Sequence, residues 1–180
     1  FIPRTAWTSL ECESVSDGIV VDVSKHLKKI LKIDQDAKTV TLQPGVIRDD
    51  LNRVLKDYGL FFGPNTSTSN RCMIGGMVGN NTSGTTSIKY GTTREKLVSL
   101  KTILSDGSEA EFKDISAEEF QEKLKLENRE GEIYRNINKH LSSEENKKEL
   151  IEKFPPKSLH RSNTGYAIDE LLYAEVFSEG

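Results

Sequence analysis

The sequence has few of the residues and runs that mark several common classes of protein. Its only two cysteines, Cys12 and Cys72, lack the spacing of a metal site, and a reduced, intracellular protein is the simplest interpretation. No apolar run is long enough to span a bilayer. Lysine and arginine form no dense run and the net charge is −3, which argues against nucleic acid as a partner.

Motifs of the common catalytic classes are also absent. Ser67 and Ser83 have no evident base partner, so a hydrolase triad has no support. Gly79 and Gly84 have the glycine spacing of a P-loop, but Thr85 stands where that motif needs lysine, and no G-x-G-x-x-G triplet occurs. The three histidines lie far apart in no metal-binding pattern, which predicts surface or packing roles; they are His26, His140 and His160. We assign no catalytic residue and no metal ligand.

Short apolar runs separated by turn residues predict the elements of the first two thirds of the chain. Residues 18–24 are a β-branched run typical of a strand. Two apolar runs around a polar turn predict a hairpin over 30–43, and a second hairpin is predicted over 97–112. Helical spacing of apolar residues predicts a helix over 49–58 that ends at Gly59.

The block 116–156 is charged and has the signals of helices. Two S-x-x-E patterns predict capping boxes, and Pro155 and Pro156 end the last helix. The capping boxes are Ser116 with Glu119 and Ser142 with Glu145, and the two later helices span about 131–141 and 144–154. Strands and helices mix without strict βαβ alternation along the chain, which predicts the α+β fold class.

Residues 63–93 are rich in glycine, serine, threonine and asparagine, and they have neither helical nor strand periodicity. Such a segment can present several backbone N–H groups in one direction, and glycine lets a ligand approach the backbone closely. A long solvated loop is the alternative interpretation, and composition alone favours it. The length of the segment favours a functional role, because long loops in compact domains are usually either functional or disordered.

Three runs in this segment, GPNTS at 63–67, IGGMVGNNTSG at 74–84 and KYG at 89–91, resemble the second FAD-contacting loop of the FAD-linked oxidase family. That family includes glycolate oxidase, D-lactate dehydrogenase and D-2-hydroxyglutarate dehydrogenase. Residues 3–10 resemble its pyrophosphate loop. Further landmarks follow in the same order, at 17–22, 43–46, 104–107 and 163–166.

The resemblance implies an FAD-binding domain of the vanillyl-alcohol-oxidase (PCMH) type, with a mixed, mostly antiparallel sheet flanked by helices. Residues 1–24 would be the remnant of the first lobe with the pyrophosphate loop. Residues 25–180 would be the second lobe, with a helical insertion at about 116–156. We expect the chain to be truncated at both ends, so that part of the adenine pocket, part of the flavin wall and the cap domain lie outside it.

The resemblance also implies the residues that contact FAD. Non-covalent FAD is expected, because no histidine lies in the pyrophosphate loop, where some relatives attach the flavin. The matched positions are Thr5, Ala6, Thr8, Ser9, Pro64, Thr66, Ser67, Ile74, Gly75, Gly76, Asn81, Ser83, Gly84, Tyr90 and Gly91. We expect the backbone of Gly75 and Gly76 to line a cleft, with Asn81 and Ser83 directed into it or bracing it. Residues 163–166 either approach the flavin edge or form an Asx-type turn.

Two departures from the family pattern bear on the cofactor. Trp7 stands where the family usually has glycine, and Glu11, Cys12 and Glu13 replace a run of a small residue, glycine and glutamine. An indole would crowd the phosphates and carboxylates would repel them. We therefore expect this chain to bind FAD weakly or not at all.

The resemblance implies oxidation of a small 2-hydroxy acid, with hydride passing from Cα to flavin N5. The substrate would be held by the cap domain, and the electron acceptor would be a quinone, a cytochrome, an iron–sulfur partner or oxygen. A non-catalytic flavin-binding module and an NADPH-dependent cell-wall precursor reductase of the same fold are the alternatives. The runs I-G-G and N-T-S-G disfavour the reductase. We expect a cytoplasmic protein, with peripheral attachment to the inner membrane left open.

Overall fold

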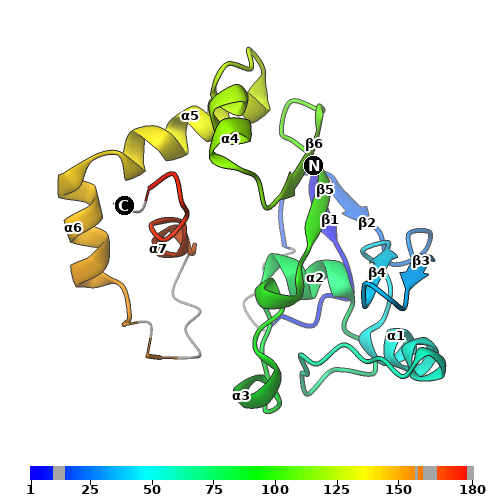
Figure 1. Cartoon of the computed structure of the whole chain (residues 1–180). Coiled ribbons are helices and arrows are strands. Elements are labelled where there is room, and N and C mark those ends of the chain that lie inside the picture. The colour runs from blue at the N-terminus through cyan, green and yellow to red at the C-terminus, as the bar shows by residue number, and fades with distance from the viewer. Residues whose placement is uncertain (10–14, 157, 160–165, 178–180) are drawn as a thin grey trace. The chain divides into compact units, whose positions relative to one another are not determined.

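The computed structural model describes residues 1–9, 15–156, 158–159 and 166–177 (Figure 1). The chain divides into two compact units, Phe1–Lys96 and Leu97–Gly180, and each is described by itself. None of the described helices has both the length and the apolar character that a membrane span requires.

The first unit begins with a parallel strand pair. Strand β1 (Ile2–Arg4) pairs with β2 (Val20–Asp22), with Ile2 opposite Val20 and Arg4 opposite Asp22. The strand expected over 18–24 is thus confirmed at its centre. The pairing brings the end of β1, where the matched residues 5–9 begin, beside the end of β2.

An antiparallel hairpin and a helix follow. Strands β3 (Ile30–Asp34) and β4 (Thr39–Leu42) form the predicted hairpin. Asp34 Oδ1 accepts a hydrogen bond of 3.0 Å from the Ala37 amide in its turn. The predicted helix is α1 (Arg48–Leu55), which tightens into the 3-10 turn η1 (Lys56–Tyr58). It ends at Gly59, whose φ of 67° is left-handed and suits glycine.

The segment 63–93 contains two helices that sequence periodicity does not predict. They are α2 (Ile74–Gly79) and α3 (Ser87–Tyr90), and the 3-10 turn η2 (Arg94–Lys96) follows. The lack of helical periodicity in this segment therefore does not exclude helices. The physical reason is length: six and four residues make too few turns for a repeating apolar pattern, although Ile74 and Met77 are buried three positions apart on one face of α2.

The second unit is a hairpin followed by helices. Strands β5 (Ser99–Ile103) and β6 (Glu109–Lys113) pair in antiparallel register, as predicted. The helices are α4 (Ala117–Leu124), α5 (Arg129–Leu141), α6 (Glu144–Lys153) and α7 (Ile168–Leu171). They share an apolar cluster of buried residues, which are Phe120, Tyr134, Leu141, Leu172 and Phe177.

One of the two predicted capping boxes forms. Ser116 Oγ accepts from the Glu119 amide at 3.2 Å, and Glu119 Oε2 accepts from the Ser116 amide at 2.9 Å. The second prediction is wrong by one residue, since Ser143 caps α6 through the Asn146 amide. Ser142 instead ends α5, where its hydroxyl bonds to Asn138 Oδ1 at 3.3 Å.

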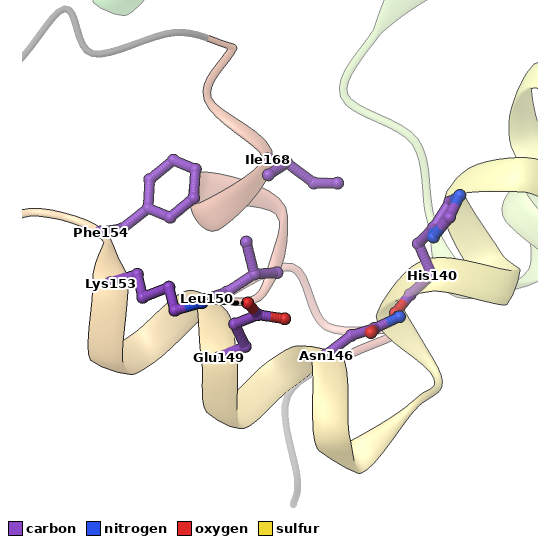
Figure 2. Close-up of a pocket in the computed structure, with 7 residues that line it drawn as sticks. All are labelled: His140, Asn146, Glu149, Leu150, Lys153, Phe154 and Ile168. Carbon is purple, nitrogen blue, oxygen red and sulfur yellow. Dashed lines mark hydrogen bonds and ion pairs between the residues drawn. The ribbon is translucent and has the colours of Figure 1, made fainter.

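A cavity of about 240 Å³ lies in the second unit beside α6 (Figure 2). Three of its four polar lining side chains already have partners, and the His140 imidazole makes no hydrogen bond among the described residues. Asn146 Nδ2 donates to the His140 carbonyl at 3.0 Å, and Lys153 pairs with Glu149. The rest of the lining is Leu150, Phe154 and Ile168. The cavity thus presents few free polar groups to a ligand.

The strands of the described residues form three two-stranded sheets, two antiparallel and one parallel. This confirms an α+β fold with mostly antiparallel pairing, although the strands do not join into one sheet within the described part of the chain.

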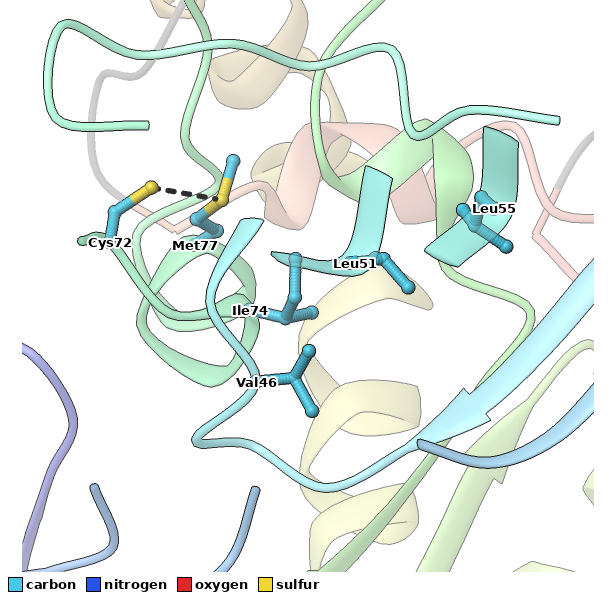
Figure 3. Packing of buried hydrophobic residues seen from close by; sticks show 6 residues of the cluster. All are labelled: Val46, Leu51, Leu55, Cys72, Ile74 and Met77. Atoms are coloured by element: carbon cyan, nitrogen blue, oxygen red, sulfur yellow. Dashed lines mark hydrogen bonds between the residues drawn. The ribbon is translucent and has the colours of Figure 1, made fainter. Parts of the chain in front are cut away.

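The core of the first unit joins α1 to α2 (Figure 3). Leu51 and Leu55 from α1 pack with Val46 and with Ile74 and Met77 from α2. Burial of these side chains is the main favourable term for this unit, at about 25 cal/mol per Å² of apolar surface. It also fixes α2, and with it the double glycine, against α1.

Truncation of this core should destabilise the first unit strongly. Leu51 is 1% exposed, so Leu51→Ala should lower the free energy of unfolding by about 2–5 kcal/mol in urea denaturation. Val54 lies on the same helix and is 39% exposed, so Val54→Ala should cost less than about 1 kcal/mol. Equal losses in the two variants would contradict the assignment of the core.

Candidate functional site

Three segments far apart in the sequence meet at glycine positions, where a side chain would block the contact. A Cβ on Gly76 would lie 2.5 Å from Thr5 Oγ1, so the start of α2 touches the turn after β1. A Cβ on Gly84 would lie 1.6 Å from the Asn65 carbonyl oxygen, far inside van der Waals contact. The turn 5–9, the run 63–67 and the run 74–84 are therefore brought together.

Helix α1 holds the run 63–67 in place through its polar face. Arg48 Nε donates to the Pro64 carbonyl at 3.1 Å and Arg48 Nη2 to the Phe62 carbonyl at 3.2 Å. Asn52 Oδ1 accepts from the Phe62 amide at 2.6 Å, and its Nδ2 donates to the Phe62 carbonyl at 3.2 Å. Pro64 is fully buried. Sequence reasoning missed Arg48 and Asn52, whose i, i+4 spacing on one helix face was the available signal.

Within 63–67 the two matched polar side chains differ. Thr66 Oγ1 accepts from the Thr68 amide at 3.2 Å and donates to Cys72 Sγ at 3.4 Å, so it is occupied inside its own turn. Ser67 is exposed. Asn65, which sequence reasoning did not select, has a buried Oδ1 with no hydrogen-bond partner among the described residues.

The start of α2 packs inward. The Ile74 side chain belongs to the core, and the Ile74 and Gly75 amides donate to the carbonyls of Val46 at 2.9 Å and Pro44 at 2.8 Å. A Cβ on Gly75 would lie 2.5 Å from Pro44 Cβ. Within the described chain, the Gly76 amide makes no hydrogen bond. The double glycine thus lets α2 approach both Pro44 and the Thr5 side chain, and the Gly76 amide has no partner among the described residues.

The end of this segment is braced by side chains. Asn81 has a φ of 43°, which asparagine tolerates better than most residues, and its Oδ1 accepts from the Arg94 amide at 2.9 Å. Thr93 Oγ1 donates to the Thr82 carbonyl at 2.7 Å. The Gly84 amide donates to Ser87 Oγ at 2.9 Å. The half-buried Ser83 side chain has no hydrogen bond within the described residues.

Tyr90 and Gly91 close the segment. The Tyr90 ring packs edge-on against Phe61 with centroids 5.0 Å apart, and a Cβ on Gly63 would strike it. Gly91 has a φ of 76°, and the Glu95 carboxylate lies where its Cβ would be. Glu95 Oε1 accepts from the amide and hydroxyl of Thr92, and the amide hydrogen bond lowers the pKa of Glu95 below its ordinary value.

The turn after β1 presents unpaired donors. Nowhere in the described structure do the amides of residues 5–8 find an acceptor. Trp7, in their midst, has a left-handed φ of 55°. Consecutive amides that include a left-handed residue are typical of anion-binding nests. Gly76, whose amide is also without an acceptor among the described residues, packs against the Thr5 side chain. The turn and the start of α2 thus hold unpaired donors of the kind that a pyrophosphate requires, so the residues present fit an FAD phosphate.

Arg4 adds positive charge next to this turn. Its Nη1 pairs with Asp22 Oδ2 at 3.3 Å, and its Nε is buried without a partner among the described residues. Among those same residues, no group of three or more His, Cys, Asp or Glu side chains is arranged to hold a metal ion. Glu11, Cys12, Glu13 and residues 163–165 lie outside the described residues.

Comparison with known proteins identifies the family. The profile of the FAD binding domain family matches residues 1–113, so the chain belongs to that family, whose cofactor is FAD. The match includes every segment that meets around Gly76 and Gly84.

The similar proteins align with different shares of this chain. D-2-hydroxyglutarate dehydrogenase of Pseudomonas putida is 38% identical over 94% of this chain and 16% of its own length. Glycolate oxidase subunit GlcD of Bacillus subtilis is 37% identical over 59% of this chain and 23% of its own length. A solved alkyldihydroxyacetonephosphate synthase matches 66% of this chain and 22% of its own at a TM-score of 0.56 and 24% identity, which supports the fold. The chain thus spans only a small part of the relatives that it matches.

The contact between Gly84 and Asn65 predicts a sharp difference between two glycines. Gly84→Ala should lower the free energy of unfolding by about 1–3 kcal/mol or more, because its Cβ would overlap a backbone oxygen. Gly79→Ala is the matched control, since nothing lies within 4 Å of its Cβ, and it should change stability by about 1 kcal/mol or less. Denaturant titration checks both, and similar stability of the two variants would refute the close approach.

The Glu95 contact predicts a pH dependence. Because hydrogen bonds lower the folded pKa of Glu95 below its ordinary 4.5, its contribution to stability is present above that value and is lost as pH falls through the folded pKa. Glu95→Gln removes this titration, so its melting temperature should fall less than that of the wild type between about pH 5 and pH 3. Glu109→Gln, at a strand position in the other unit, is the control and should follow the wild type.

Proposed function

We propose that this chain forms the FAD-binding portion of an oxidoreductase that oxidises a small 2-hydroxy acid. When bound, FAD supplies the hydride acceptor at flavin N5. The observation that carries the proposal is the meeting of the turn 5–9 with the runs 63–67 and 74–84, through glycines that leave no room for a side chain. Membership of the FAD binding domain family supports it.

The turn 5–9 would bind the pyrophosphate. The amides of Thr5, Ala6 and Thr8 have no acceptor among the described residues, Ser9 continues the turn, and the Gly76 amide would donate to the same phosphate from α2. Hydrogen bonds to a charged acceptor are about twice as strong as those between neutral groups, so a few such amides matter. No side chain on this turn needs to carry charge for this role.

The runs 63–67 and 74–84 would line the rest of the cofactor site. Pro64, Thr66 and Ser67 form one wall in this proposal, and Gly75, Asn81, Ser83 and Gly84 form the other, with Ile74 fixing α2 from the core. Tyr90 and Gly91 would support the second wall from behind. The buried Asn65 Oδ1 would accept a hydrogen bond from a donor of the cofactor, because a buried acceptor without a partner is otherwise unfavourable.

A 2-hydroxy dicarboxylate of the D-2-hydroxyglutarate type is the substrate that we favour. The alignment with the Pseudomonas putida D-2-hydroxyglutarate dehydrogenase covers 94% of the chain, so it includes most of the helical block after 113. Alignments with the Bacillus subtilis glycolate oxidase protein and with D-lactate dehydrogenase [cytochrome] 1 of Saccharomyces cerevisiae cover 59%. Alignment over the helical block therefore distinguishes the D-2-hydroxyglutarate dehydrogenase from the glycolate oxidase and D-lactate dehydrogenase proteins. The substrate would be contacted by the rest of a longer protein. The same part would pass electrons to the acceptor, which would be a quinone, a cytochrome, an iron–sulfur partner or oxygen.

The natural protein that carries this sequence should contain FAD and should be reduced by its substrate. Mixed anaerobically with D-2-hydroxyglutarate, it should lose flavin absorbance near 450 nm (on the order of full bleaching at saturating substrate), and D-lactate and glycolate should act more slowly. Bleaching by NADPH alone would favour the reductase alternative. Bound flavin that none of these compounds bleaches would favour a non-catalytic flavin-binding module.

A further inference from the structure

Trp7 occupies a backbone conformation that a bulky aromatic residue rarely adopts. Its φ of 55° is left-handed, where Cβ crowds the neighbouring carbonyl and where glycine is the usual residue. Strain of this kind persists only where the surrounding contacts determine the conformation.

Arg4 and Asp22 provide those contacts. The Arg4 guanidinium carbon lies 4.9 Å from the centroid of the Trp7 ring, a cation–π geometry. Arg4 is fixed in turn by its ion pair with Asp22 at 3.3 Å and by β1–β2 pairing, in which the Val23 amide donates to the Arg4 carbonyl at 3.0 Å. Asp22 Oδ1 itself accepts from the Ser24 amide at 2.8 Å. The Trp7 ring is thereby tied to the end of the parallel strand pair.

We propose that Trp7 is a positioning residue of the cofactor site, resting on the proposed FAD site in the turn 5–9. Stacked on Arg4, Trp7 holds its own backbone in the left-handed conformation, and this keeps the amides of residues 5–8 free for an anion. Glycine reaches the same φ without strain but also leaves it freely. Trp7 therefore preorganises the turn where a glycine would leave it flexible.

This proposal and steric crowding of the phosphates by the indole make opposite predictions. If the ring crowds the phosphates, removing it tightens FAD binding. If the ring positions the turn, removing it weakens binding, because the free turn must then be ordered when the ligand binds. The packing of the ring on Arg4 favours the second outcome.

Three substitutions of Trp7 separate these cases. FAD affinity is measured by flavin fluorescence anisotropy in the apo form of the natural protein that carries this sequence, for wild type, Trp7→Phe, Trp7→Leu and Trp7→Gly. We expect Trp7→Phe to stay within about twofold of wild type, because a phenyl ring still stacks on Arg4. Trp7→Leu and Trp7→Gly should weaken binding by about two- to fivefold, the size of an exposed cation–π contact. Leucine keeps bulk and loses the aromatic face, so it distinguishes stacking from volume.

A spectroscopic measurement tests the stacking without FAD. Trp7 is the only tryptophan, so all indole fluorescence of the chain reports on it. Arg4→Gln should change its emission, and Arg53→Gln, which removes an exposed ion pair with Asp50 on α1 of the same unit, should not. Thermal melts of all variants serve as the control for folding.

Three results would overturn the proposal: tighter binding by Trp7→Gly, equal affinities of Trp7→Leu and Trp7→Phe, or no saturable FAD binding by the wild type. Affinity and emission are measured without turnover. A failure of the natural protein to oxidise hydroxy acids would therefore refute the proposed function and leave this result intact.

Discussion

The first unit depends on two backbones that approach each other more closely than side chains allow. At Gly84 the chain passes the carbonyl of Asn65 at a distance that would place a Cβ 1.6 Å from the oxygen. The hydrogen bond of Thr86 to the Gly63 carbonyl and the brace between Asn81 and Arg94 hold the flanking residues on either side. Where two backbones approach this closely, peptide groups rather than side chains make the contact.

The sequence predicts those parts of the fold whose cause is local. The hairpin over 30–43 follows from two apolar runs around a turn, and the helix over 49–58 from apolar spacing that ends in a left-handed glycine. The capping box of Ser116 and Glu119 is likewise a contact between near neighbours. The order of the glycine-rich runs also led to the FAD family, which the family profile over 1–113 confirms.

The remaining features depend on contacts between residues far apart in the chain. Arg48 anchors Pro64 across 16 positions, and Asn65 has significance only because the fold buries its unpaired oxygen. No local pattern marks Asn65, and the i, i+4 spacing of Arg48 and Asn52 indicates a shared helix face but not its contact with residues 62–64. Helix α2 was missed also because three of its six residues are glycines, which are poor helix formers, and packing against the turn at Pro44 compensates for that intrinsic cost. Trp7 illustrates the same limit: its residue type suggests crowding, while its partner, Arg4, is visible only in the folded chain.

The sulfur contacts beside α2 connect the glycine-rich run to the core. Cys72 is 4% exposed, accepts a hydrogen bond from Thr66 Oγ1 at 3.4 Å and lies 3.6 Å from Met77 Sδ. A thiol-alkylating reagent can reach this sulfur only when the run and the core separate locally. The rate at which Cys72 is alkylated therefore reports how often these openings occur. Peptide mapping distinguishes alkylation of Cys72 from any alkylation of Cys12. A ligand that binds between the runs on either side of this thiol would suppress these openings and slow the alkylation of Cys72, even if the ligand itself undergoes no reaction.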